Sequence, residues 1–459
     1  MAFAGVLPHP WPPPQWRLGP ALGCGTGLLS EHRGASMPSF SPAASVWAAT
    51  AASGPDLPAI TGERRADVAI VGAGFTGLVA ALTLARGGAS VIVVDMVEPG
   101  FGASGRNGGQ VIPGLKDDPD TLDRVFGEAT TAFAGGTADL VFSLIDELGI
   151  DCDPVRGGWI QASVKHLHLP RLESRMAQWR ARGAAVEMLD AAGMAAATGG
   201  RGFVGGWIDR RGGSVHPLAY ARGLARAALE AGAEIFRDAE AVSITRGTGG
   251  WVLGFADGGR LTAGQVVIAT NGYTGRLWPG LKATVIPANS IQVATAPLPE
   301  DLRARILPGR PVVSDSRRIA NYFRIGPEGR LMMGGRGAFR EPRDAADYRR
   351  IEAALAAFYP EAARLPVGFR WAGRVAMTRD HLPHIHQPAA GVTMALGYNG
   401  RGVALASAMG RAIGAHLLDG ANPLPLALSA IRPMPVHGLH PLYATAMIEA
   451  YRVRDMLER

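Results

Sequence analysis

The stretch VAIVGAGFTG, residues 68–77, decides the fold of this chain. A β-branched run followed by G-x-G-x-x-G predicts a buried strand, a tight turn and the start of a helix. In that setting Gly72 permits the turn, Gly74 lets the backbone approach a pyrophosphate, and Gly77 lets the helix pack on the sheet. The pattern predicts a dinucleotide-binding βαβ unit.

The residues that follow complete this unit. Gly77–Arg86 is typical of a helix with small side chains, and Ser90–Asp95 of a second buried strand. Asp95 comes 18 residues after Gly77, where its carboxylate can accept hydrogen bonds from both hydroxyls of an adenosine ribose. The uncharged run of residues 68–85 approaches the length of a membrane span, but its glycines favour strand, turn and helix.

Composition sets broader limits. A chain of 459 residues with 47% hydrophobic residues exceeds one ordinary domain, so we expect two intertwined domains. The net charge of +7 comes mostly from scattered arginines, which favours anionic ligands weakly and nucleic acid hardly at all. Two cysteines, Cys24 and Cys152, exclude a disulfide framework and indicate a reducing compartment, by default the cytoplasm. We expect no transmembrane segment.

Both ends of the chain are predicted to lie outside the domains. Residues 1–59 are rich in Pro, Ala, Gly and Ser and are expected to form a poorly ordered lead-in. We hypothesise that translation starts at Met37, which a peptide from residues 1–36 in the native protein would contradict. Residues 423–459 are expected to be a C-terminal tail.

The remaining pattern alternates helices with short strands. Leu169–Arg182 and Pro217–Gly232 read as helices, and two hairpins are predicted, at Trp251–Leu261 and at Asn321–Gly335. This favours an α/β chain with a Rossmann-like domain and a second, mainly antiparallel domain.

A second glycine-rich stretch, FGASGRNGGQ at residues 101–110, forms a backbone-rich loop that can press against a flat ring or a phosphate. Joined to the βαβ unit, it makes the chain resemble the FAD-dependent D-amino-acid-oxidase-like family, and within it the gamma-glutamylputrescine oxidoreductase group. The group's pattern G-A-S-G-R-N-G-G stands complete here. Further landmarks are VHP at 215–217, VVIATNGY at 266–273, YFR at 322–324, WAGR at 371–374 and GYNGRGV at 397–403.

The resemblance implies FAD as cofactor, bound without a covalent link because no matching cysteine is present. It implies an FAD-binding domain built from residues 60–140, 212–284 and 372–422, and a substrate domain built from residues 141–211 and 285–371. The residues expected to contact FAD are Gly72, Gly74, Gly77, Asp95, Ala103, Ser104, Arg106, Asn107, Gly108, Gly109, Gln110, Thr270, Gly272, Gly397, Gly400, Gly402 and Val403.

Two departures from the family pattern stand out. Asp95 replaces the more usual glutamate, and His386 stands where relatives carry glycine. His381, His384 and His386 lie close together in sequence, but no fourth ligand is evident, and we predict no metal site.

The implied activity is oxidation of a small amine, such as a gamma-glutamyl amine, to an imine by hydride transfer to the flavin. Tyr322 and Arg324 are the candidate substrate residues, because residues two apart on a strand face the same side. Arg324 either pairs with a substrate carboxylate or faces the surface. Trp159, Trp371 and Tyr398 are candidates for an aromatic wall or for plain core.

Other activities remain open on the same pattern. A D-amino acid dehydrogenase, a glycine or sarcosine oxidase, and a flavin-binding partner protein without turnover would all carry it, as would, less well, a nicotinamide-dependent dehydrogenase. Either oxygen or a protein electron acceptor could reoxidise the flavin.

Overall fold

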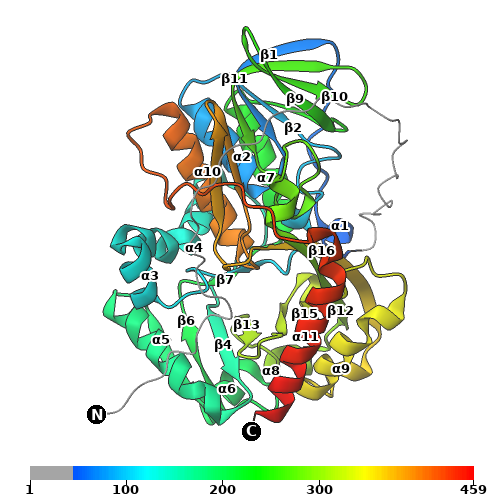
Figure 1. Cartoon of the computed structure of the whole chain (residues 1–459). Helices are drawn as coiled ribbons and strands as arrows, with labels where there is room; N and C mark the ends of the chain where they lie inside the picture. The colour runs from blue at the N-terminus through cyan, green and yellow to red at the C-terminus, as the bar shows by residue number, and fades with distance from the viewer. Residues whose placement is uncertain (1–44, 459) are drawn as a thin grey trace. The chain divides into compact units, whose positions relative to one another are not determined.

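The computed structural model describes residues 45–458 (Figure 1). The hypothesis of a start at Met37 and most of the predicted lead-in therefore lie outside the described residues.

A parallel sheet forms around the first glycine motif. Its strands run in the order β17-β18-β11-β1-β2-β8, with β9 and β10 added beside β11. The bounds are β1 Glu63–Val71, β2 Val91–Val94, β8 Glu234–Phe236, β9 Ala241–Gly247, β10 Gly250–Phe255, β11 Arg260–Ile268, β17 His384–Ala389 and β18 Val392–Leu396. Strands β1, β2, β8, β11 and β18 are parallel, whereas β17 pairs antiparallel with β18 and β10 with β11. The hairpin predicted at Trp251–Leu261 is the β10–β11 pair.

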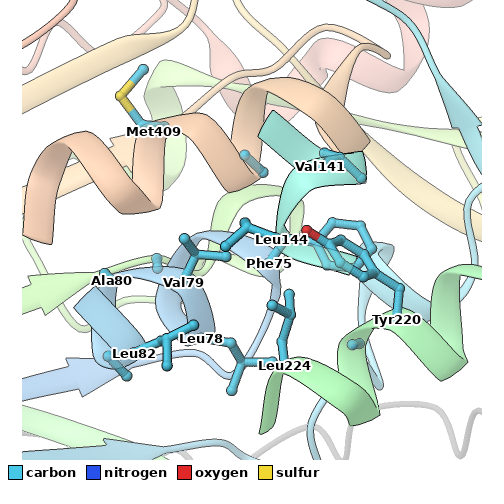
Figure 2. Close-up of a cluster of buried hydrophobic side chains, with 14 of the residues drawn as sticks. Phe75, Leu78, Val79, Ala80, Leu82, Val141, Leu144, Tyr220, Leu224 and Met409 are labelled. Carbon is cyan, nitrogen blue, oxygen red and sulfur yellow. The ribbon is translucent and has the colours of Figure 1, made fainter. Parts of the chain in front are cut away.

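The two faces of this sheet are both apolar, as a doubly covered parallel sheet requires. Ile70, Val93 and Val267 point toward helices, while the alternate residues Ala69 and Ile92 point toward β10. The helices on the first face are α2 Phe75–Arg86, α4 Glu128–Leu148, α7 Pro217–Glu230 and α10 Gly402–Leu418. Figure 2 shows Phe75 and Leu78 of α2 packed among Val141 and Leu144 of α4, and Tyr220 and Leu224 of α7.

A second sheet has the order β16-β12-β15-β14-β13-β4-β6-β5. The bounds are β4 Trp159–Ser163, β5 Val186–Asp190, β6 Gly205–Asp209, β12 Ile286–Pro297, β13 Val312–Asp315, β14 Tyr322–Ile325, β15 Arg330–Arg336 and β16 Val367–Met377. The β4–β13 pair is parallel, and the other pairs of this sheet within residues 45–458 are antiparallel. The α/β fold with a second, mainly antiparallel sheet is therefore confirmed, and the hairpin predicted at Asn321–Gly335 is the β14–β15 pair.

Smaller elements complete the described chain. They are α1 Val46–Thr50, β3 Gln110–Val111, α3 Pro119–Phe126, α5 Leu169–Ala181, α6 Ala191–Thr198, β7 Gly213–Ser214, α8 Glu300–Arg305, α9 Arg349–Phe358 and α11 His440–Leu457. Within residues 45–458, no helix combines the length and the apolar composition that crossing a bilayer requires.

The second sheet separates two kinds of side chain by the period-two alternation of its strands. On one face Val313, Phe323 and Met333 pack with Ile351 and Leu355 of α9 in a hydrophobic core. The residues between them face the other way and include polar and aromatic side chains: Trp159, Gln161, Ser290, Gln292, Ser314, Tyr322, Arg324, Arg336 and Trp371. We call this second set the polar face.

The predictions for the chain ends need correction where the structure describes them. Residues 45–59 are not a loose lead-in, because α1 buries Val46 and Trp47 completely. The predicted tail contains the helix α11, seen in red in Figure 1. Asp455 of this helix and Glu458 directly after it form ion pairs with Arg318. Composition alone did not reveal these contacts, since each depends on a partner far away in sequence.

Trp47→Ala is expected to lower the free energy of unfolding by about 3–5 kcal/mol, because it removes a fully buried aromatic side chain. Urea denaturation of the purified protein measures the loss, with Ala49→Ser in the exposed part of the same helix as control. If Trp47→Ala costs no more than the control, α1 is not part of the folded core.

Candidate active site

Four loops meet at the carboxyl edge of the first sheet. They follow β1, β2, β11 and β18, and they span residues 72–77, 95–110, 270–273 and 397–402. The amide of Gly100 donates to the carbonyl of Ala73 at 3.0 Å, and the amide of Gly397 donates to Oδ1 of Asn271 at 2.9 Å. Ligands bind at this edge in open α/β sheets, so the predicted cofactor residues lie where a cofactor is expected.

The first loop has the geometry that its glycines predict. Gly72 has a φ of +108°, which a residue with a side chain rarely adopts. A Cβ at Gly77 would lie 2.0 Å from the carbonyl oxygen of Gly72, so no side chain fits there. Helix α2 begins directly after Gly74 without a side-chain cap, and its N-terminus offers partial positive charge to a diphosphate.

Asp95 lies directly after β2 and contacts this loop. Its Oδ2 accepts the amide of Ala73 at 2.8 Å, and its Oδ1 accepts the amide of Val97 at 3.0 Å. Burial raises the pKa of Asp95 to about 6, because the charged carboxylate is poorly solvated there. The carboxylate is therefore beside the diphosphate turn, as the sequence predicts.

The loop of residues 102–110 is held from within and from outside. Inside it, Asn107 donates to the carbonyls of Ala103 and Ser104 at 3.0 and 2.8 Å and accepts the amide of Gly109 at 2.7 Å. Ser104 Oγ accepts the amide of Phe75 at 3.0 Å, which joins the loop to α2. These predicted residues therefore act on the loop's shape through their side chains.

The polar face of the second sheet contacts the same loop. The carbonyl oxygen of Arg106 accepts hydrogen bonds from Gln292 Nε2 at 2.7 Å and from Trp371 Nε1 at 3.0 Å. A Cβ at Gly108 would lie 2.8 Å from the ring of Tyr322, so that ring lies directly against the glycine. The loop is thus placed between the two sheets.

Tyr322 and Arg324 share the polar face, as their spacing predicts, but their surroundings differ. Arg324 is 2% exposed, and its Nη1 donates to the carbonyls of Val215 at 2.7 Å and Gly109 at 3.1 Å. The surface-facing interpretation of Arg324 is therefore wrong. Its guanidinium supports the back of the loop through Nη1, while its buried Nη2 has no hydrogen-bond partner among residues 45–458.

The side chain of Gln110 joins the loop to the second sheet, and a backbone contact of this residue with FAD stays a prediction. Its Nε2 donates to the carbonyls of Val313 and Phe323 at 3.1 and 3.3 Å, and its Oε1 accepts from Ser314 at 3.2 Å. Its side-chain amide is therefore occupied by the second sheet rather than directed at a cofactor.

The remaining predicted residues lie at the same edge. Thr270 Oγ1 contacts Thr274 Oγ1 at 2.8 Å, and Gly272 lies against Arg374. Gly397, Gly400 and Gly402 precede or begin α10, and a Cβ at Gly400 would meet nothing within 4 Å. Val403 is buried in the helix core, so only its backbone can face a ligand.

Of the three aromatic candidates, two lie on the polar face of the second sheet and one lies in the hydrophobic core of the helix layer. Trp159 and Trp371 lie on the polar face, and Trp159 Nε1 donates to Ser314 at 3.2 Å. Tyr398 contacts Thr76 Oγ1 at 2.7 Å and joins the starts of α10 and α2. It is a core residue of the helix layer.

The histidine cluster has structural partners. His384 Nε2 contacts Asp380 at 2.9 Å, and the buried His386 contacts the carbonyl of Ser429 through Nδ1 at 2.7 Å. Within residues 45–458, no three His, Cys, Asp or Glu side chains are grouped in a way that could hold a metal ion.

Sequence reasoning missed several residues that build the site. Trp47 donates its indole N–H to the carbonyl of Asn107 at 2.9 Å and lies under the guanidinium of Arg324. Gln292 belongs to β12, where the alternation of apolar and polar residues predicts which side chains share a face of the sheet but not what they bind. Arg336 carries a charge that acts on Tyr322, and no local motif marks it.

The residues present fit FAD. The glycine turn at the start of α2, where Ser104 occupies only the amide of Phe75, suits the diphosphate. Asp95 suits the ribose, and the open space above Gly400 at the start of α10 suits the ring system. Together with the second sheet, this arrangement defines a two-domain flavoprotein oxidoreductase.

Comparisons with known proteins identify the family. A family model described as "FAD dependent oxidoreductase" matches residues 67–416. The chain is 34% identical to a probable oxidoreductase OrdL of Rhizobium meliloti, over 81% of this chain and 87% of that protein. It is 31% identical to gamma-glutamylputrescine oxidoreductase of Escherichia coli, over 77% and 84%. The chain therefore belongs to the FAD-dependent oxidoreductases of the D-amino-acid-oxidase family, which confirms the predicted cofactor FAD and the predicted class of enzyme.

A solved structure agrees on the fold. Glycine oxidase from Geobacillus kaustophilus superimposes with a TM-score of 0.69 at 24% identity, covering 81% of this chain and 99% of that one.

The FAD affinity is expected to rise with pH up to about 6 and then to level off. In the predicted contact, ribose hydroxyls would donate to the ionised carboxylate of Asp95, whereas in the free protein burial keeps this group protonated below about pH 6. Asp95→Asn is expected to weaken FAD binding about 10- to 100-fold and to remove this pH dependence. Quenching of flavin fluorescence on titrating the apoprotein between pH 5 and 8 measures both, with the exposed Glu63→Gln as control. An unchanged pH profile in Asp95→Asn would count against the ribose contact.

Arg324→Met is expected to weaken FAD binding and to affect charged and uncharged substrates alike. The substitution leaves the carbonyl of Val215 without the donor Arg324, which costs about 1–3 kcal/mol. The carbonyl of Gly109 loses one of its two donors and keeps the amide of Val215. Steady-state kinetics with a carboxylated amine and its methyl ester, beside the exposed Arg349→Met as control, measure the discrimination. Selective loss of the carboxylated substrate would return Arg324 to the substrate site.

Proposed function

We propose that this protein oxidises a small amine, a gamma-glutamyl amine or a close analogue, to the imine by hydride transfer to non-covalently bound FAD. The observation that carries the proposal is the placement of the loop of residues 102–110 directly against the polar face of the second sheet. A cofactor ring held by that loop would lie beside Tyr322, whose own ring contacts the loop at Gly108. The relatives named above support an oxidoreductase, and one of them acts on gamma-glutamylputrescine.

The protein's contribution is to position the substrate and to control its protonation. When bound, FAD accepts the hydride from the carbon that carries the amine. The residues around Tyr322 hold that carbon in place and exclude water, so that orientation supplies much of the rate. Burial raises the pKa of Tyr322 to about 12, so its hydroxyl stays protonated and remains a hydrogen-bond donor or acceptor.

The charge of the surroundings favours the reactive form of the substrate. Hydride leaves only from a carbon whose amine is neutral, because the nitrogen lone pair assists its departure. The guanidinium of Arg336 acts on Tyr322 of this wall, and positive charge lowers the pKa of a nearby ammonium. This cation therefore favours loss of a proton from the bound amine. The imine then leaves and hydrolyses in water.

Two points of the proposal rest on composition. Cys152 is the one cysteine of the described residues; it is buried, and its carbonyl accepts the amide of His216 just before α7. Burial raises the pKa of its thiol to about 12, which disfavours the thiolate that a covalent link would need and supports non-covalent FAD. The low cysteine usage supports a reducing compartment, the cytoplasm.

Anaerobic reduction of the purified yellow holoenzyme tests the proposal. We expect gamma-glutamyl amines to bleach the oxidised flavin faster than free polyamines, glycine, sarcosine or D-amino acids do. Faster bleaching by glycine or sarcosine would assign the reaction to that class instead, in line with the similarity to glycine oxidase. No bleaching by any compound would leave a flavin-binding protein without turnover. Denaturation with acid should release free FAD into the supernatant.

A further inference from the structure

The short helix α1 lies against the loop of residues 102–110. The indole N–H of Trp47 in this helix donates to the carbonyl of Asn107 at 2.9 Å. Trp47 is fully buried, and the centre of its ring lies 4.8 Å from the ring centre of His216 and 6.2 Å from that of Trp371. Because both neighbours are aromatic and close, the indole has little room to turn, and its N–H keeps one direction.

A second contact holds α1 in place. Thr50 Oγ1 lies 3.1 Å from Nε2 of His216, which directly precedes α7. Burial lowers the pKa of His216 to about 4, so the ring is neutral near pH 7. Its Nδ1 accepts the amide of Ala219 at 3.2 Å, so the proton is on Nε2 and Thr50 is the acceptor. Helix α1 is therefore joined to the start of α7 as well as to the loop.

The hydrogen bond from Trp47 fixes one peptide unit of the loop. The carbonyl of Asn107 accepts no other hydrogen bond from residues 45–458. In a trans peptide the carbonyl and the following N–H point in opposite directions, so the amide of Gly108 points away from Trp47. This amide has no acceptor in the part of the chain that the structure describes. Trp47 therefore directs an unpaired donor toward the other side of the loop.

The two ends of the loop belong to different parts of the cofactor site. Ser104 accepts the amide of Phe75 at the start of α2, where the diphosphate is expected. Gly108 lies four residues further along, directly against the ring of Tyr322 on the polar face. The flavin ring exchanges electrons with a substrate held between the two sheets, so we expect it at the Gly108 end of the loop.

We propose that Trp47 is a positioning residue for FAD, which holds the amide of Gly108 as a hydrogen-bond donor to the flavin ring. Reduction adds electron density to the nitrogen and carbonyl groups of that ring, so a fixed donor stabilises the reduced form more than the oxidised form. Without the indole N–H the peptide of residues 107–108 is free to rotate, and the donor loses its direction. The proposal concerns the bound cofactor and does not depend on which amine is oxidised.

FAD binding and the docking of α1 are expected to stabilise each other. In the free protein the loop is able to relax and let water reach the carbonyl of Asn107, whereas bound FAD keeps the loop in one shape. Helix α1 contacts that same loop, so its docking raises the affinity for FAD. By linkage, FAD favours the docking of α1 by the same factor. The segment around Trp47 should therefore be better protected when FAD is bound.

Trp47→Phe tests the proposal, because phenylalanine keeps an aromatic ring and removes the N–H. Trp251→Phe is the matched control: Trp251 is also buried, and its indole donates at 3.0 Å to the carbonyl of Ala390, which precedes β18 at the edge opposite the glycine loops. Titration of each apoprotein with FAD, followed by flavin fluorescence, is expected to give a Kd about 5- to 30-fold higher for Trp47→Phe and unchanged for the control. Equal Kd values for the two variants would overturn the proposal.

The reduction potential of bound FAD separates positioning from a general loss of stability. Equilibrium reduction of the FAD-saturated proteins by dithionite against a reference dye measures it without any amine. We expect a lower potential in Trp47→Phe than in the native protein and in Trp251→Phe, whereas lost packing alone lowers the free energy of unfolding and leaves the potential unchanged. An unchanged potential would contradict the contact between the amide of Gly108 and the ring. Failure of gamma-glutamyl amines as substrates would leave this result intact.

Thr50→Val is a milder variant that keeps the buried indole and removes the contact with His216. Thr445→Val is its control, because the hydroxyl of Thr445 likewise donates to the carbonyl four residues earlier, in α11. Chymotrypsin cleaves after aromatic residues, so cleavage after Trp47 reports the undocking of α1. We expect FAD to slow this cleavage strongly in the native protein and in Thr445→Val, and less in Thr50→Val. Cleavage of the native protein that FAD does not slow would overturn the coupling.

Discussion

One backbone carbonyl, that of Arg106, joins a loop of the first sheet to two side chains of the second sheet. It accepts the amide of Gln292 and the indole N–H of Trp371, both from the second sheet, while its own residue belongs to a loop of the first. A carbonyl oxygen has two lone pairs, and here both have partners in a buried setting where a lost hydrogen bond is costly. The loop of residues 102–110 therefore has little freedom, and the site between the sheets follows from its position.

The second sheet serves as core and as wall because its strands alternate. Phe323 and its apolar neighbours pack on α9, and this burial supplies the free energy that keeps the sheet folded. The opposite side chains are then available for polar contacts, and Gln110, Tyr322 and Arg324 all take part in fixing the loop. A helix could not divide its residues into two such faces over so short a distance.

The sequence by itself determined those structural features that depend only on residues close together in the chain. The β-branched run and glycines of residues 68–77, the position of Asp95 after β2 and the shared face of Tyr322 and Arg324 depend on neighbours within a few residues of chain, and a period of two or 3.6 residues reveals them. Fold class and cofactor could be predicted for that reason.

Tertiary structure alone decided which side chains meet distant backbone groups. Arg324 and Val215 lie 109 residues apart in sequence, and nothing in the stretch around either one indicates the other. Arg324 was a reasonable candidate for a substrate carboxylate, yet its Nη1 donates to the carbonyls of Val215 and Gly109 behind the loop. The burial of Trp47 and the docking of α11 have the same origin. Contacts between distant segments depend on how the sheets pack, and packing is a property of the whole chain.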